Sequence, residues 1–94
     1  MSLNRYAKRV DSNQDAIVSA LRAAGAHVLI LSKPVDLLVG VPFTKKLALF
    51  ECKTPKTGKL TKAQLDFLAE WYMYPLFVVD GPENALEFYM ELSK

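Results

Sequence analysis

The sequence has only one cysteine, Cys52, and its apolar runs are short. A single cysteine excludes an internal disulfide and a thiolate metal cluster, and it is typical of a reducing compartment. The longest apolar runs, such as Val28–Leu31 and Leu47–Phe50, fall far below the ~20 residues of a membrane span. The first ten residues are polar and basic and lack the apolar core of a signal peptide. We therefore expect a cytoplasmic protein.

Glycine and proline are also scarce, at 4 and 5 of 94 residues, which excludes collagen-like and low-complexity chains. Hydrophobic residues make up 51% and charged residues 23% of the chain, a balance typical of packed globular proteins rather than disordered ones. A chain of this length forms one domain with a single small core, so we expect one unit over residues 1–94.

Positive charge is concentrated in the first two thirds of the chain. Residues 1–62 carry 11 Lys and Arg against 4 Asp and Glu, whereas residues 63–94 carry 1 against 6. Segregated basic charge is expected of a phosphate-binding face, although the local bias of an ordinary solvated surface would look the same. The charge pattern therefore indicates where a site lies and not what it binds.

Apolar spacing and turn residues predict the element order α-β-β-β-α-β-α, which is an α/β fold with a mixed central sheet flanked by helices. Helix-capping signals set the helix boundaries, and Thr61-Lys62-Ala63-Gln64 matches a capping box. The predicted elements are a helix from a cap at Asp11 or Ser12 to Ala24, strands His27–Ser32, Val35–Val39 and Leu47–Lys53, a helix from Thr61 to Tyr72, a strand Pro75–Asp80 and a helix Glu83–Leu92.

The strand Leu47–Lys53 changes character along its length. It is apolar on both faces as far as Phe50, as in a strand covered by helices on each side. Glu51 and Lys53 then follow on one face, with Cys52 on the other. Polar residues at a strand end are expected where α/β sheets open into clefts.

An antiparallel hairpin that pairs Gly40 with Leu47 would place Asp36 opposite Glu51, whereas a register slipped by two residues would separate them. Directly opposed residues have Cβ atoms about 4.5–5.5 Å apart, so two carboxylates would repel each other. Either Lys53 or a divalent cation could offset that repulsion. Mg²⁺ is the better candidate, because it prefers hard oxygen ligands and needs only one or two protein carboxylates.

Pro34, Asp36 and the run Glu51-Cys52-Lys53 resemble the motif of the PD-(D/E)XK nuclease superfamily. More narrowly, the chain resembles a stand-alone VRR-NUC domain, the virus-type replication-repair nuclease module of phages and bacteria. The matching segments cover nearly all of the chain and read DSNQDAIVSALRAAGAHVL, PVDLLVG, LALFECK and GKLTKAQLDFL. In one departure, Val35 separates the proline from the aspartate, where the family usually has Gly-x-Pro-Asp.

The resemblance implies a restriction-endonuclease-like fold and a nuclease that depends on Mg²⁺ or Mn²⁺. It implies Asp36 and Glu51 as metal ligands, the Cys52 carbonyl as a third ligand and Lys53 as the catalytic lysine. A metal held in this way can polarise a phosphate, and the lysine can stabilise the negative charge that develops during hydrolysis. The structural alternative is a salt bridge between Glu51 and Lys53.

Two glutamines are further candidates for the catalytic site. Gln14 continues the apolar stripe of the first helix toward the sheet, and with Asp11 it matches the acidic-x-x-Gln pattern of the family's first helix. Capping of the helix is the alternative role for Asp11. Gln64 lies on the inner stripe of its helix, and a capping-box role with Thr61 is compatible with a role in the site.

Four lysines are predicted to bind DNA: Lys56, Lys59 and Lys62, which follow the motif, and Lys33, which precedes it. They could contact phosphates that flank the cleaved bond, with help from the nearby helix N-terminus. An ordinary solvated lysine loop is the alternative.

We therefore predict a metal-dependent, structure-selective endodeoxyribonuclease that hydrolyses phosphodiester bonds in branched DNA, above all Holliday (four-way) junctions, in a bacterial cell or a phage-infected host. Stand-alone members of the family look like junction-resolving dimers, which implies a homodimer. Trp71–Tyr74 or the last helix, through Leu86, Phe88 and Tyr89, could form the interface. The alternatives are a non-catalytic module that binds DNA structures and a nuclease that acts on flaps or other DNA ends.

Overall fold

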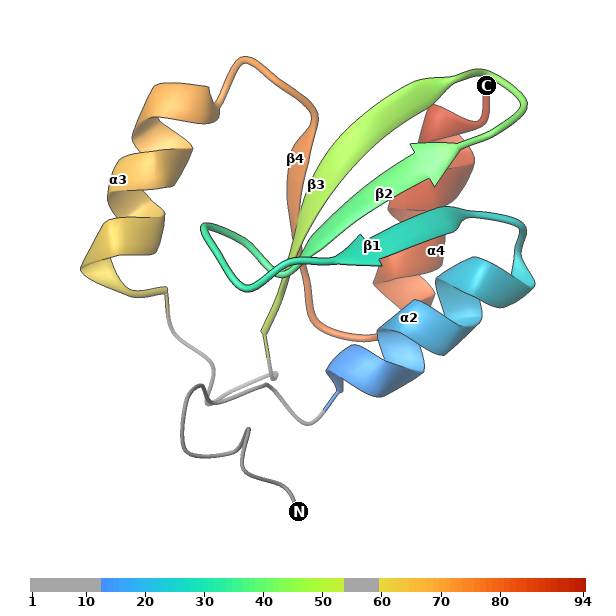
Figure 1. Cartoon of the computed structure of the whole chain (residues 1–94), viewed down its shortest axis with the longest axis horizontal. Coiled ribbons are helices and arrows are strands. Elements are labelled where there is room, and N and C mark those ends of the chain that lie inside the picture. Colours follow the sequence, from blue (N-terminus) through green and yellow to red (C-terminus); the bar gives the residue numbers. More distant parts are fainter. Residues whose placement is uncertain (1–12, 54–59) are drawn as a thin grey trace.

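The computed structural model describes residues 13–53 and 60–94, and its elements follow the predicted order (Figure 1). They are α2 (Gln14–Ala23), β1 (His27–Ile30), β2 (Leu37–Val41), β3 (Lys46–Cys52), α3 (Lys62–Trp71), β4 (Leu76–Val79) and α4 (Pro82–Leu92). The predicted α/β class with a mixed sheet is confirmed. The second strand is the least accurate prediction, because it begins two residues later than expected.

The four strands form one sheet in the order β1-β2-β3-β4. β2 pairs antiparallel with both β1 and β3, whereas β4 runs parallel to β3, so that α3 serves as the crossover between them. Gly40 lies opposite Leu47, which confirms the predicted hairpin register. The regular pairing ends at Leu37 and Phe50, immediately before Asp36 and Glu51.

Helices α2 and α4 pack against each other on the same side of the sheet and bury the hydrophobic core (Figure 1). Phe50 is fully buried there and makes an edge-to-face contact with Phe77 at a centroid distance of 5.6 Å. The helices contribute Ile17, Val18, Leu21, Ala85, Tyr89 and Leu92 to this core, and the sheet contributes Leu37, Val39, Val41, Ala48, Phe50, Cys52 and Val79.

The opposite face of the sheet, which we call the open face, is covered by the described residues only near the carboxyl end of β3. Helix α3 stands apart from α2 and α4 (Figure 1) and contributes no buried residue. Leu29, Leu47 and Val78 are exposed on this face, although Gln64 at the start of α3 does reach Glu51. The expectation that helices cover both faces of the third strand is therefore wrong for the amino-terminal half of β3.

Capping chemistry explains where the helices begin and end. The predicted capping box starts α3, since Gln64 N–H donates to Thr61 Oγ1 at 3.1 Å and Thr61 N–H donates to Gln64 Oε1 at 3.0 Å. Gly25 ends α2 with φ of +103°, a left-handed conformation that favours glycine. Pro82 lies in the first turn of α4, where its missing N–H is not needed.

The predicted N-cap of the first helix differs from the structure. The N-cap position is Asn13 and not Asp11 or Ser12, both of which lie outside the described residues.

None of the helices in the described ranges has the length and apolar character that crossing a bilayer requires.

Candidate active site

Asp36 and Glu51 come together on the open face, at the ends of β2 and β3. They take the positions that follow the last regular pair of the hairpin, as the sequence predicts. Asp36 is 7% exposed and Glu51 only 2% exposed. Their carboxyl groups are close enough for the charge of Asp36 to act on the pKa of Glu51. The structure thus brings two buried carboxyl groups side by side.

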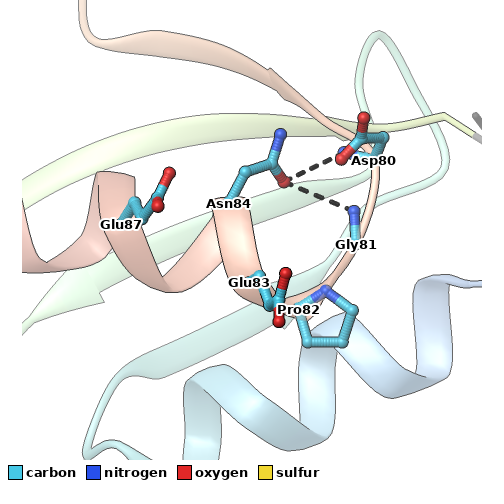
Figure 2. A pocket seen from close by; sticks show the side chains of 6 residues that line it. All are labelled: Asp80, Gly81, Pro82, Glu83, Asn84 and Glu87. Atoms are coloured by element: carbon cyan, nitrogen blue, oxygen red, sulfur yellow. Dashed lines mark hydrogen bonds between the residues drawn. The ribbon is translucent and has the colours of Figure 1, made fainter.

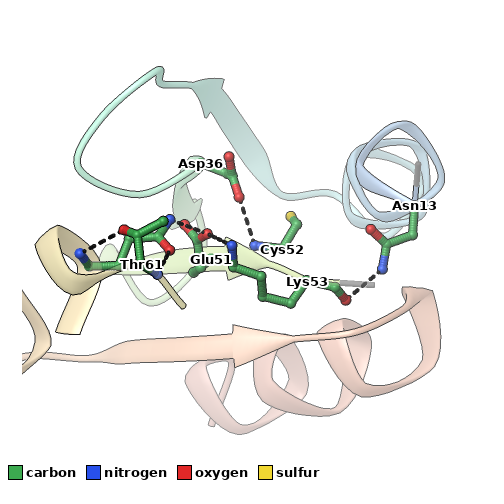
Figure 3. A network of polar contacts seen from close by, with 7 residues as sticks. Asn13, Asp36, Glu51, Cys52, Lys53 and Thr61 are labelled. Carbon is green, nitrogen blue, oxygen red and sulfur yellow. Dashed lines mark hydrogen bonds and ion pairs between the residues drawn. The ribbon is translucent and has the colours of Figure 1, made fainter. Parts of the chain in front are cut away.

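Backbone contacts fix Asp36 on both sides. Its Oδ2 accepts a hydrogen bond from the Cys52 N–H at 2.9 Å (Figure 3). Its carbonyl oxygen accepts one from the Leu31 N–H at 2.6 Å. Val35, the residue that departs from the family pattern, is buried. The extra residue therefore does not keep Asp36 from β3.

Among the described residues, the second carboxyl group, on Glu51, has two hydrogen-bond donors at one oxygen and none at the other. Gln64 Nε2 donates to Glu51 Oε2 at 2.5 Å, and Lys53 Nζ lies 3.3 Å from the same oxygen (Figure 3). Glu51 Oε1 is buried and has no hydrogen-bond partner among the residues that the structure describes. An unpaired buried carboxylate oxygen is unfavourable, and it is a natural position for a ligand or a cation.

Burial raises the pKa of the Glu51 carboxyl from its ordinary 4.5 to about 7. The negative charge of Asp36 raises this pKa further, and the Lys53 ammonium opposes both effects without cancelling them. The positive charge of Lys53 alone therefore does not offset the unfavourable burial of the Glu51 carboxylate beside Asp36. Carboxyl groups perturbed by burial together with a specific charged neighbour are typical of functional sites.

Gln64 takes part in the capping box and also contacts Glu51, whereas its catalytic role stays a prediction. Its Oε1 accepts from the Thr61 N–H in the capping box, while its Nε2 donates to Glu51. Because the capping box occupies the oxygen, the amide nitrogen must face the carboxylate. The start of α3 thereby orients Glu51.

Gln14, the other glutamine, is 6% exposed, which confirms that it faces inward. Its Oε1 has no hydrogen-bond partner within the described ranges. Among the described residues, no hydrogen bond joins Gln14 to Asp36 or Glu51, so its catalytic role stays a prediction.

Asn13 is a site residue that the sequence reasoning missed. Its side-chain amide donates to the Lys53 carbonyl at 3.0 Å and to the Asp80 carbonyl at 2.7 Å. The sequence offered only a weak signal, an asparagine beside a predicted helix start, and that signal indicates a cap rather than a bridge to two distant strands.

The predicted DNA-binding lysines are only partly described. Lys56 and Lys59 lie outside the described residues, as does Asp11. Lys33 is exposed, and Lys62 is exposed on the first turn of α3, where it pairs with Asp66 at 3.1 Å. An exposed pair of this kind contributes little to stability, so it does not restrain Lys62 strongly.

A hollow lies at the start of α4, and Asp80, Glu83 and Glu87 give it an acidic lining (Figure 2). Its central polar group is already used, because Asn84 Oδ1 accepts hydrogen bonds from the N–H groups of Asp80 and Gly81. The lining of this hollow includes no lysine or arginine, whereas Lys53 lies beside the carboxylate pair on the open face, so the carboxylate pair is the better candidate site for a nucleic-acid phosphate.

The donor set at the carboxylate pair fits Mg²⁺. Within residues 13–53 and 60–94, no three side chains of His, Cys, Asp or Glu form a complete metal site. Mg²⁺ does not require one, because it commonly uses one or two carboxylates together with waters and substrate phosphate. Asp36 and Glu51 would hold the ion, with the unpaired Glu51 Oε1 as the clearest donor. The N–H and C=O of a strand residue point to the same side, so the Cys52 carbonyl also faces the Asp36 side of β3.

Comparisons of the chain with protein-family models, with curated proteins and with solved structures found no match. The assignment of an activity therefore depends on the chemistry of the site.

Proposed function

We propose that this protein is a metal-dependent endodeoxyribonuclease with a restriction-endonuclease-like fold. The observation that carries the proposal is the buried Asp36–Glu51 pair at the end of β3, with Lys53 and Gln64 directed at one oxygen of Glu51. The resemblance of the motif to VRR-NUC domains supports the same reaction. A structural salt bridge would account for Lys53 and Glu51 but gives no reason for a second buried carboxylate beside them.

Each side chain of the site has a different role in the proposed hydrolysis of a phosphodiester. A bound Mg²⁺ or Mn²⁺ would supply Lewis-acid polarisation of the phosphate. Asp36 and Glu51 hold the negative charge that attracts the cation, and Gln64 keeps the Glu51 carboxylate in one orientation. Lys53 places an ammonium group beside this pair, where it can donate to a phosphate oxygen as negative charge develops.

Branched DNA, above all a four-way junction, is the substrate we propose, and a homodimer is the proposed assembly. Two symmetric cuts in a junction require two copies of a site that each chain carries once. Leu29, Leu47 and Val78 on the open face and the Trp71–Tyr74 segment are exposed apolar groups that a second copy could cover. The last helix is a weaker candidate for the interface, because Tyr89 is buried in the core.

Cleavage of a DNA panel tests the proposal. The panel comprises linear duplex, single strand, flap, splayed arm and four-way junction, each with Mg²⁺, with Mn²⁺ or with EDTA. We expect metal-dependent cleavage that is greatest on the junction and is lost in Glu51→Gln, while the control Glu87→Gln in the acidic hollow cleaves normally. Absence of cleavage on every substrate, with binding retained, would favour a non-catalytic DNA-binding module instead.

A further inference from the structure

Asn13 occupies the N-cap position of α2 but does not cap the helix. An asparagine at this position ordinarily accepts a hydrogen bond from an N–H of the first turn. Here the side chain makes no such bond, and its Oδ1 is buried without a partner among the described residues. Both donated hydrogen bonds go instead to carbonyl groups far along the chain, at Lys53 and Asp80.

The two carbonyls belong to the residues that directly follow the parallel strands. Lys53 follows β3 and Asp80 follows β4. The strands are also joined at this end by the Lys53 N–H, which donates to the Val79 carbonyl at 2.8 Å. The Asp80 N–H is in turn held by Asn84 at the start of α4 (Figure 2). Asn13 therefore ties α2 to the carboxyl ends of β3 and β4.

The orientation of the Asn13 amide is determined by its partners. Two carbonyl oxygens can only accept, so the NH₂ group must face them and the oxygen must face away. A carboxylate at this position would oppose both carbonyls with negative charge. The position thus requires a donor of two hydrogen bonds, and no described residue bonds to the amide oxygen.

We infer that Asn13 is a positioning residue for Lys53, and this inference rests on the proposed nuclease function. A lysine side chain has four rotatable bonds, so its ammonium group stays beside Glu51 only if its main chain is held. The Asn13 bridge restrains the carbonyl of Lys53 (Figure 3). Asn13 acts through that main chain and does not touch the reacting groups.

Two substitutions separate this bridge from helix capping. Asn13→Ser keeps a residue type favoured at N-caps but is too short to reach both carbonyls. Asn13→Asp keeps the size of the side chain and removes both donors. The matched control is Asp15→Asn, two positions along the same helix, where the side chain is exposed.

Two measurements are made on each variant: cleavage kinetics on a four-way junction, and amide hydrogen exchange by NMR. We expect both Asn13 variants to lower kcat at least tenfold with KM changed less than threefold. The Lys53 amide should exchange at least tenfold faster, while the Leu21 amide in the middle of α2 exchanges at the wild-type rate. Asp15→Asn should match the wild type in every measurement.

Unchanged exchange of the Lys53 amide in Asn13→Ser would overturn the inference, whether or not the protein cleaves DNA. Equal acceleration at Lys53 and Leu21 would also overturn it, because it would indicate general loosening of α2. If the wild-type protein cleaves nothing but the exchange response is confined to the Lys53 end of β3, the nuclease proposal fails and the hold of Asn13 on Lys53 stands.

Discussion

Leu47 and Glu51 lie four residues apart on the same face of β3, yet the leucine is 60% exposed and the glutamate 2% exposed. This is the reverse of the distribution that the hydrophobic effect favours. At the Glu51 end, Asp36, Lys53 and the start of α3 enclose the carboxylate. At the Leu47 end, no described helix covers the sheet. One end of the open face therefore buries a pair of carboxyl groups, which is unfavourable for stability, and the other end exposes an apolar surface.

The largest effect is expected on cleavage at the carboxylate end. Glu51→Gln preserves shape and the acceptor for Gln64 but removes the negative charge, so we expect cleavage to fall by roughly 10³-fold, about 4 kcal/mol in activation free energy. DNA affinity should stay within threefold of wild type, because phosphate contacts elsewhere supply most of it. Cleavage rates and fluorescence anisotropy measure the two quantities. Near-normal cleavage would remove Glu51 from the site.

The next largest effect is expected on the free energy of unfolding, at the face of the sheet that α2 and α4 cover. Phe50 lies one residue before Glu51 but points into the core, where it is fully buried against Phe77. We expect Phe50→Ala to lower the free energy of unfolding by about 3–5 kcal/mol. Urea denaturation measures this loss. A loss below 1 kcal/mol would mean that α2 and α4 do not pack on this face as described.

A pH dependence of stability follows from the raised pKa of Glu51. The folded protein holds this proton up to about pH 7, whereas the unfolded chain releases it near 4.5. The protonated Glu51 carboxyl therefore makes its full contribution to the free energy of unfolding below pH 4.5, and this contribution is lost as the pH rises through 7. Without metal, wild type should lose about 2–3 kcal/mol relative to Glu51→Gln between pH 5 and pH 8. Parallel pH profiles of the two proteins in urea denaturation would contradict the raised pKa.

Added metal should recover part of that loss. At pH 8, 10 mM Mg²⁺ at a Kd of about 1 mM stabilises the folded state by about 1–2 kcal/mol, which raises Tm by several degrees in a domain of this size. Glu51→Gln and Asp36→Asn should show no comparable increase. Thermal denaturation with Mg²⁺ and with EDTA makes the comparison. An equal shift in all three proteins would indicate metal binding elsewhere.

The smallest effect on folding is expected at the exposed end. Leu47→Ser removes a side chain that is already largely in water, so we expect the free energy of unfolding of the monomer to change by less than about 1 kcal/mol. The same variant should weaken self-association in sedimentation equilibrium. A wild-type protein that is a monomer, both free and with a junction, would contradict the homodimer.

The sequence by itself determined the elements and the pairing of the two carboxylates. Capping residues and apolar spacing are local signals, so they located the helices to within a few residues. The hairpin was also predicted from local signals, because Gly40 and Leu47 flank a short turn and a one-residue shift would move the apolar residues to the other face. A slip by two residues would keep the faces, and it is the structure that excludes it. The capping box of Thr61 and Gln64 was equally readable.

Only the tertiary structure decided how the faces are covered and which distant groups meet. The apolar stripes of the three helices do not indicate which face of the sheet each helix covers. In the structure, α2 and α4 cover the same face, and α3 contributes no buried residue. The bridge from Asn13 to Lys53 and Asp80 spans 40 and 67 residues of sequence, and no periodicity encodes it. The burial and the raised pKa of Glu51 also depend on neighbours from separate elements, because desolvation is a property of the packed structure and not of the chain.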